Sequence, residues 1–245
     1  MKGKTMKNEN NDMEQGKYYI DENGRCVIPE GVTEIEKSAF MGCTSLQRVD
    51  IPNSVTKIGF DAFSGCTSLK SIDIPNSVDE IGMEAFCDCT SLESVNFFLC
   101  RLREISVGVF NGCKSLKAIS LPFMRLRSIR LAAFHRCTSL KNIEIPNGVT
   151  KIDGSFLGCT SLERVIIPGS VEFINNTSFE DCPSLKEIHL GIHSLNGAFI
   201  REGSFDKNAK AHGTLYVPAS CIQACREHEE LGQFKNIEIE EKKHP

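Results

Sequence analysis

Residues Ile51 to Leu69 read IPNSVTKIGFDAFSGCTSL, and most of the chain repeats this stretch. Its cysteine returns at steps of 22 to 24 residues, with a phenylalanine three residues before it and a Ser-Leu pair two residues after it. A fixed period of this length predicts a solenoid, in which each repeat buries its apolar face against its neighbours. The repeated cysteines are Cys43, Cys66, Cys89, Cys113, Cys137, Cys159 and Cys182.

Within one repeat, the apolar pattern predicts where the chain is extended. Ile72 and Ile74 alternate with Ser71 and Asp73, which is the period of a strand. Pro75 then ends the pairing, because proline has no N–H to donate to a ladder. A second short extended piece is expected at positions like 55–58, followed by one tight turn of helix around residues 61–63. The repeated phenylalanines are expected to stack as an aromatic spine.

The fold class predicted is a single right-handed leucine-rich-type solenoid of about eight turns, with a parallel β-sheet on its concave side and short turns or 3₁₀ pieces elsewhere. We expect a disordered leader at residues 1–16 and one domain at 17–245. The domain divides into an N-terminal hairpin cap at 17–29, repeats at 30–213 and a strand-helix-strand cap at 214–245. The enlarged unit between Gly191 and Gly213 is expected to be mobile.

The motif A-F-x-x-C-x-S-L-x-x-[IV]-x-[IL]-P and the ending from Leu215 to Ile237 resemble the BspA-like, treponemal-type family of leucine-rich repeats. The resemblance covers roughly Ile28 to Ile239. It implies a non-catalytic binding module, often on bacterial surfaces and in adhesion.

The placement of the twelve cysteines argues against a disulfide scaffold. Seven occupy one repeated position, and an odd number cannot pair among themselves. Stacked residues lie about 4.8 Å apart, farther than the roughly 3.8 Å that disulfide Cβ atoms prefer. We therefore predict a ladder of buried free thiols, which suits a reducing compartment.

Composition narrows the function classes. The net charge of −4 gives no global reason to expect nucleic acid or an anionic membrane as partner. No apolar run approaches the ~20 residues of a membrane helix. The first sixteen residues carry no secretory signal, so we expect a cytoplasmic protein if Met1 is the native start, and a cell-surface protein if the true N-terminus lies upstream.

Two irregular repeats carry the best candidate for a partner-binding site. Residues 91–140 hold a net charge of +6, which leaves −10 for the rest of the chain. Arginine beside exposed aromatic residues is typical of interface centres, whereas an ordinary solvated basic face is the alternative. The candidate residues are Arg101, Arg103, Arg125, Arg127, Phe98 and Phe123.

The outward positions of the concave sheet form a second candidate surface, small, polar and mixed in charge. They include Arg48, Asp50, Ser71, Asp73, Ser94, Asn96, Asn142, Glu144, Arg164, Glu187 and His189.

No arrangement of residues points to catalysis, a cofactor or a metal. Cys221, Cys225 and His228 share one face of a predicted helix, but zinc needs a fourth ligand, so we expect thiols packed on the last repeat. We therefore expect a monomeric protein-protein interaction module of unknown partner, acting through the concave sheet or the arginines. The alternative is a surface adhesin that binds a host matrix protein or a glycan. Nucleic-acid binding by the arginines is the least favoured reading.

Overall fold

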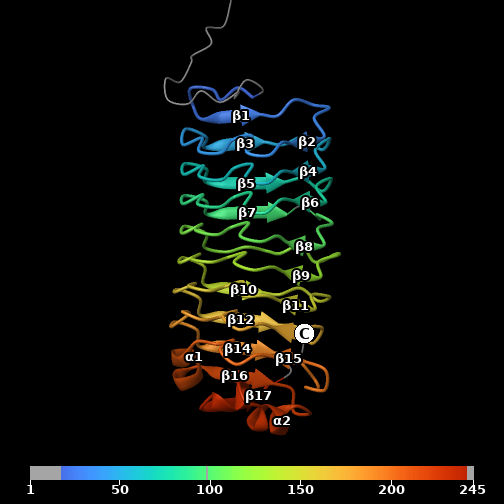
Figure 1. Cartoon of the computed structure of the whole chain (residues 1–245), viewed down its shortest axis with the longest axis vertical. Coiled ribbons are helices and arrows are strands. Elements are labelled where there is room, and N and C mark those ends of the chain that lie inside the picture. Colours follow the sequence, from blue (N-terminus) through green and yellow to red (C-terminus); the bar gives the residue numbers. More distant parts are fainter. Residues whose placement is uncertain (1–17, 98, 242–245) are drawn as a thin grey trace, which may run out of the picture.

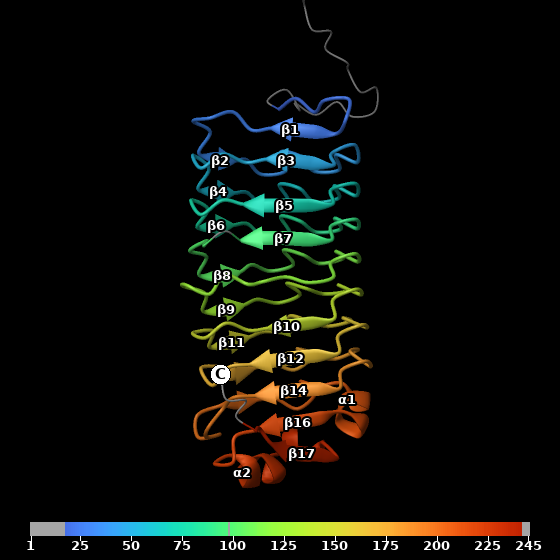
Figure 2. The same ribbon diagram turned by 180° about the vertical axis from the view of Figure 1, so that it is seen from behind.

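The computed structural model describes residues 18–97 and 99–241. In this part of the chain, about nine turns stack into one solenoid, one more than expected (Figure 1). The same column seen from behind shows the strands of successive turns lying one above the other (Figure 2). No helix among these residues is long and apolar enough to cross a membrane.

One side of the solenoid, the long-strand face, carries strands that pair in parallel and place alternate side chains in the core. Ile72 pairs with Val95 and Val165 with Ile188, so apolar residues of successive turns lie in register. These strands are β1 (Arg25–Val27), β3 (Arg48–Asp50), β5 (Ser71–Ile74), β7 (Ser94–Phe97), β10 (Asn142–Glu144), β12 (Arg164–Ile167), β14 (Glu187–Leu190), β16 (Thr214–Val217) and β17 (Asn236–Ile239).

A second set of two-residue strands follows each corner, and each ends in a buried isoleucine. They pair in parallel in two groups, with an interruption between β6 and β8. The strands are β2 (Glu34–Ile35), β4 (Lys57–Ile58), β6 (Glu80–Ile81), β8 (Glu104–Ile105), β9 (Ser128–Ile129), β11 (Lys151–Ile152), β13 (Phe173–Ile174) and β15 (Phe199–Ile200).

The segment that returns the chain to the next long strand is a non-helical turn, so the predicted turn of helix around residues 61–63 is wrong. Asp61 has a φ of +54°, in the left-handed region that a right-handed helix does not use. The turn bonds to itself only in short steps, as Ser64 N donates to Asp61 O over 3.1 Å, and it bonds to its neighbour as well, as Phe63 N donates to Ala85 O over 2.8 Å. Pairing between repeats therefore overrides the local helical pattern.

The predicted aromatic spine is present in the core. Eight phenylalanines, from Phe40 to Phe205, stack with ring centroids 5.0 to 5.6 Å apart. Tyr18 lies on Phe40 at one end, and Phe234 closes the other end edge-on at 5.5 Å. Such offset stacking adds to the stabilisation from burial.

The predicted cysteine ladder is also present, and its thiols are hydrogen-bonded. Cys66 Sγ donates to Phe40 O of the preceding repeat over 3.1 Å, and Cys137 Sγ to Phe110 O over 3.2 Å. The same contact recurs at Cys89, Cys113, Cys159 and Cys182. Burial raises the pKa of these thiols, to about 12 for Cys182. All twelve cysteines are free.

The ten buried thiols should react only after unfolding. In the folded protein we expect a maleimide reagent to label Cys43 and Cys87, which are half-buried, and to leave the ten buried cysteines unmodified. Raising the pH from about 7 to about 9 should not change this pattern, because the raised pKa values keep the ladder protonated. Mass spectrometry with and without denaturant measures the number of labels. Disulfides within the stack, or rapid labelling of Cys137, would contradict this expectation.

The ends of the solenoid differ from its repeats. At the N-terminal end, the predicted hairpin is reduced to an antiparallel bridge between Ile20 and Cys26 around the turn at Gly24. The expected disordered leader at 1–16 lies outside the described residues. At the C-terminal end, β16 is followed by α2 (Ile222–Glu227), the 3₁₀ helix η1 (Leu231–Gln233) and β17.

The unit between residues 191 and 213, expected to be mobile, is built into the stack. It contains β15 and the helix α1 (Lys207–His212), whose N-cap Asp206 accepts a hydrogen bond from Asn208 N. Phe205 of this unit joins the aromatic spine 5.3 Å from Phe179. The extra residues therefore form a wider turn around the same core.

Candidate functional site

The candidate arginines lie at one corner of the solenoid, between the long-strand face and strands β8 and β9. Arg127 N donates to Arg103 O over 2.8 Å, so these two residues stack in register. Buried Leu102 and Leu126 anchor each Arg-Leu-Arg segment in the core. The arginines on either side of each leucine are consequently turned to solvent.

None of these four guanidinium groups has a carboxylate within ion-pair distance among the described residues. Arg127 Nη1 donates to the backbone oxygen of Leu126 over 3.0 Å. In contrast, Arg130 in the same repeat pairs with Glu104 at 3.4 Å. The four positive charges are therefore available to a partner.

Large apolar side chains are exposed beside the arginines. The exposed fraction is 60% for Leu99, 64% for Phe123 and 49% for Met124. Leu99 also has a φ of +51°, which is unfavourable for a bulky residue. Phe98, the other aromatic candidate, lies outside the described residues. We call Leu99, Arg101, Arg103, Phe123, Met124, Arg125 and Arg127 the arginine flank.

A cleft of about 430 Å³ opens at this corner. Leu99, Arg101 and Met124 line one part of it, and Asn76, Ser77 and Asp79 of the preceding repeat line the rest. It combines an apolar floor, a guanidinium group and polar acceptors, a combination that can hold a side chain of a partner.

One extra residue in each of the two irregular repeats enlarges the corner that carries the arginine flank. The cysteine spacing is 24 from Cys89 to Cys113 and again to Cys137, and the Pro-Asn-Ser corner of the regular repeats is replaced. Cys100 anchors the first enlarged corner, because its buried thiol donates to Pro75 O over 3.2 Å. Burial raises the pKa of Cys100 to about 11, so the thiol stays protonated as a donor.

The long-strand face differs in its electrostatics, because several of its charges are already paired. Arg25 and Arg48 both bond to Asp50, and although burial favours the neutral acid, these hydrogen bonds leave the pKa of Asp50 lowered. Lys117 Nζ lies 2.7 Å from Glu93. The structure places all the predicted outward residues of this face at exposed or half-buried positions.

At the C-terminal part of this face, His189 is the centre of a small cluster. Its Nδ1 lies 2.9 Å from Glu240, and its ring stacks on Tyr216 with centroids 4.8 Å apart. Arg164 lies 3.2 Å from Glu187 in the same cluster. The pairing of His189 with Glu240 links residues 51 positions apart, so no sequence pattern could reveal it.

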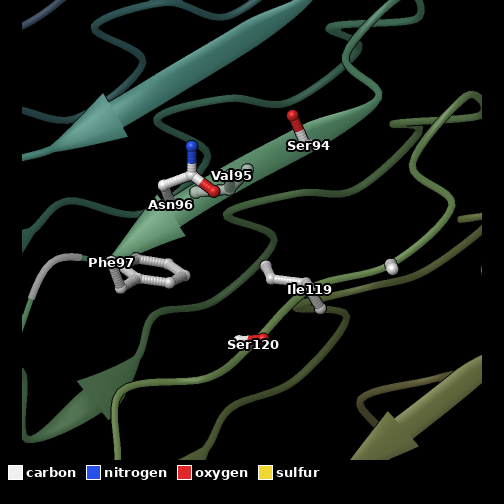
Figure 3. A pocket seen from close by; sticks show the side chains of 7 residues that line it. Ser94, Val95, Asn96, Phe97, Ile119 and Ser120 are labelled. Carbon is white, nitrogen blue, oxygen red and sulfur yellow. The ribbon is translucent and has the colours of Figure 1, made fainter.

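The long-strand sheet is interrupted next to the arginine flank. Residues 118–121 occupy a strand position, yet within the described residues they make no backbone hydrogen bond to either neighbouring repeat. A cleft of about 390 Å³ opens between them and β7. Figure 3 shows Phe97 and Ile119 facing each other across the opening. The enlarged corners thus disturb the sheet as well as the flank.

The remaining candidates form no site. Cys221 and Cys225 place their sulfur atoms 3.5 Å apart, but His228 Nδ1 accepts a hydrogen bond from Glu230 N. The described residues contain no group of three or more His, Cys, Asp or Glu side chains arranged to hold a metal ion. Burial, and after it the nearby carboxylates of Asp88 and Glu84, raise the pKa of Cys87, which keeps this thiol protonated.

The sequence analysis named the arginines and Phe123 as candidates. It did not name Leu99 or the polar wall of the cleft, which Asn76, Ser77 and Asp79 form. The loss of the corner proline at position 98 was the available signal, since it marks the repeat whose turn must differ.

Comparison with known proteins places the chain in a family. A model of the BspA type leucine rich repeat region matches in six copies, over residues 17–123 and 98–212. No curated protein matches the chain significantly. Among solved structures, a leucine rich repeat protein of T. pallidum is similar, with 27% identity over 85% of each chain and a TM-score of 0.50.

Two further solved structures are similar to parts of the chain. A leucine-rich repeat protein from Bacteroides ovatus has 24% identity over 87% of this chain and 83% of its own, with a TM-score of 0.44. A leucine rich cell surface protein from Faecalibacterium prausnitzii has 25% identity over 66% of this chain and 58% of its own, with a TM-score of 0.35. With the family model matching most of its length, the chain belongs to the BspA-type leucine-rich-repeat family.

Proposed function

We propose that the protein is a non-catalytic binding module that holds an acidic surface of another protein against the arginine flank. One observation carries this proposal: four exposed arginines, which have no carboxylate partner among the described residues, lie beside three exposed apolar side chains. Buried aromatic, methionine and arginine side chains dominate the centres of protein interfaces. Such a surface is costly to leave in water and becomes favourable when a partner covers it.

The chemistry of the arginines favours a carboxylate-bearing partner. A guanidinium group offers a planar fork of donors that matches a carboxylate in two parallel hydrogen bonds. The charge asymmetry between residues 91–140, at +6, and the rest of the chain, at −10, would also orient an acidic partner as it approaches.

The long-strand face ranks second because a partner there would compete with existing pairs. Asp50 is already bonded to Arg25 and Arg48, and Glu93 to Lys117. A ligand must replace these contacts without a net gain in ion pairing. The cleft beside β7 is one part of that face where, among the described residues, positions 118–121 lack backbone bonds to the neighbouring repeats, and it adjoins the flank.

The experiment compares three variants for binding of a partner captured from cell and matrix extracts and then purified. The first replaces Arg101, Arg103, Arg125 and Arg127 by Glu. The second replaces them by Ser, Thr, Ser and Thr, the residues found at the equivalent positions 54 and 56 of a regular repeat. The third is a control of equal charge change at exposed sites elsewhere, with Lys70, Lys141, Lys186 and Lys235 replaced by Glu.

We expect the first two variants to bind at least about tenfold more weakly, or about 1.4 kcal/mol, and the control to bind as the native protein does. Equal binding by the native protein and both flank variants would reject the flank and move the site to the long-strand face. Retention of the native protein on heparin, lost in the flank variants, without any protein partner would favour the glycan-binding adhesin instead.

A further inference from the structure

A column of apolar side chains runs along a different side of the solenoid, on the turns that follow the short strands. Its members are Phe60, Met83, Val107 and Leu131, one from each of four successive repeats. Backbone bonds place them next to each other: Asp61 N donates to Met83 O, Glu84 N to Val107 O and Gly108 N to Leu131 O, over 2.9 to 3.1 Å. Met83 and Leu131 are each 51% exposed.

Opposite charges lie beside the two halves of this column. Asp61, Glu84 and Asp88 accompany its first half, and their charges contribute to the raised pKa of Cys87 after the larger effect of burial. Arg136 accompanies its second half, and Lys114 lies in the same repeat as Val107. Within the described part of the chain, none of these five groups has an opposite charge at ion-pair distance.

The positions of the apolar and charged residues are symmetric about one repeat. Met83 and Leu131 lie one repeat before and one repeat after Val107, at equal steps of 24 residues. Asp88 and Arg136 have the same relation to Gly112, and the absence of a side chain at this glycine leaves room for the Asp88 carboxylate, which lies against it. A two-fold contact between identical chains requires this self-complementary arrangement.

We propose that a second copy of the chain covers this face, antiparallel to the first, about a two-fold axis near Val107. Met83 of one copy then packs against Leu131 of the other, and Asp88 faces the other copy's Arg136. The two-fold axis lies in the plane of the contact and runs across the apolar column. The column of one copy therefore lies over the column of the other copy, in the opposite direction. The arginine flank is on a separate corner, so the dimer would present two flanks.

The test is a charge exchange in the full chain. Asp88→Arg and Arg136→Asp are made singly and together. Both residues occupy the same turn position of their repeats, with φ of +54° and +57°. Each exchange therefore introduces a residue type that the chain already has at this turn position in another repeat. Asp181→Arg is the matched control, since Asp181 has a φ of +53° at the same position in a repeat outside the proposed contact.

Sedimentation velocity over about 1–500 µM measures the mass, a range that spans weak to moderate affinities. The native protein and the Asp181→Arg control should approach twice the 27.2 kDa of one chain as concentration rises. Each single exchange should remain at the mass of one chain, because it places like charges together, and the double exchange should recover the dimer. Circular dichroism confirms that all variants are folded.

Three results would overturn the proposal. The first is a native protein that keeps the mass of a single chain at every concentration. The second is a native dimer that both single exchanges leave intact. The third is a double exchange that is folded but does not dimerise, since the contact then lies elsewhere. Binding at the arginine flank is measured separately and does not depend on any of these results.

Discussion

Replacing Phe134 by alanine should lower the free energy of unfolding by about 3–5 kcal/mol, the range found when a buried phenylalanine leaves a cavity. Phe134 is fully buried at the middle of the spine, between Phe110 at 5.5 Å and Phe156 at 5.1 Å. Each repeat of a solenoid contacts only its neighbours, so a cavity here weakens the link between the two halves. We expect the denaturation curve to lose cooperativity as well as shift.

Urea denaturation followed by far-ultraviolet circular dichroism measures this effect, because the chain has no tryptophan to serve as a fluorescent probe. Phe123→Ala is the matched control, since Phe123 is 64% exposed and its loss should cost less than about 0.5 kcal/mol. Equal effects of the two replacements would mean that the spine does not hold the repeats together.

The second large effect is expected at Glu230, which ties the C-terminal cap to the last repeats. Its fully buried carboxylate accepts hydrogen bonds from Gly203 N at 3.1 Å and Phe205 N at 2.9 Å, and it lies 3.3 Å from Lys210 Nζ. Glu230→Ala leaves a poorly solvated ammonium group and two backbone donors without partners. Breaking a buried pair in this way costs about 3–5 kcal/mol.

Thermal or urea denaturation measures the loss in the free energy of unfolding. Hydrogen exchange shows which residues become less protected. We expect faster exchange at residues 203–213 and in β17, with the first repeats unchanged. Glu80→Ala is the control: it breaks an exposed pair with Lys57 at 3.2 Å, and because water screens such a pair its loss should change the stability little. If both variants lose the same small amount of unfolding free energy, Glu230 does not tie the C-terminal cap to the last repeats.

The aromatic spine, the cysteine ladder and the parallel strands were predictable because every repeat encodes them. A phenylalanine or cysteine recurring at one period must occupy equivalent places in a stack, so Phe63 and Cys66 fix the positions of their counterparts. The alternation of Ile72 and Ile74 with polar residues likewise identified β5. Repetition turns a local pattern into a global one.

The conformations that depend on contacts between repeats were not predictable. Asp61 adopts a left-handed φ because the turn bonds to the next repeat, and nothing in the local pattern signals this. The interruption of the sheet at residues 118–121 falls between the two enlarged corners, and the local sequence does not signal it. The helix α1 forms inside an insert whose composition resembles that of a loop.

The candidate site likewise has one part that the sequence predicts and one part that it does not. The sequence spacing placed Arg103 and Arg127 in register, as the backbone bond between them confirms. Whether a carboxylate neutralises either arginine depends on side chains from other repeats, which sequence spacing does not give. The exposure of Leu99 and the polar wall of the cleft depend on the shape of an irregular corner.

Hydrogen exchange on the complex with the captured partner tests the binding account most directly. We expect slower exchange at residues 99–103 and 123–127 when the partner is bound, together with the edge of β7 beside the cleft, and no change in β12, β14 and β16. Protection confined to those three strands, with the flank exchanging as in the free protein, would contradict the assignment of the arginine flank as the binding surface.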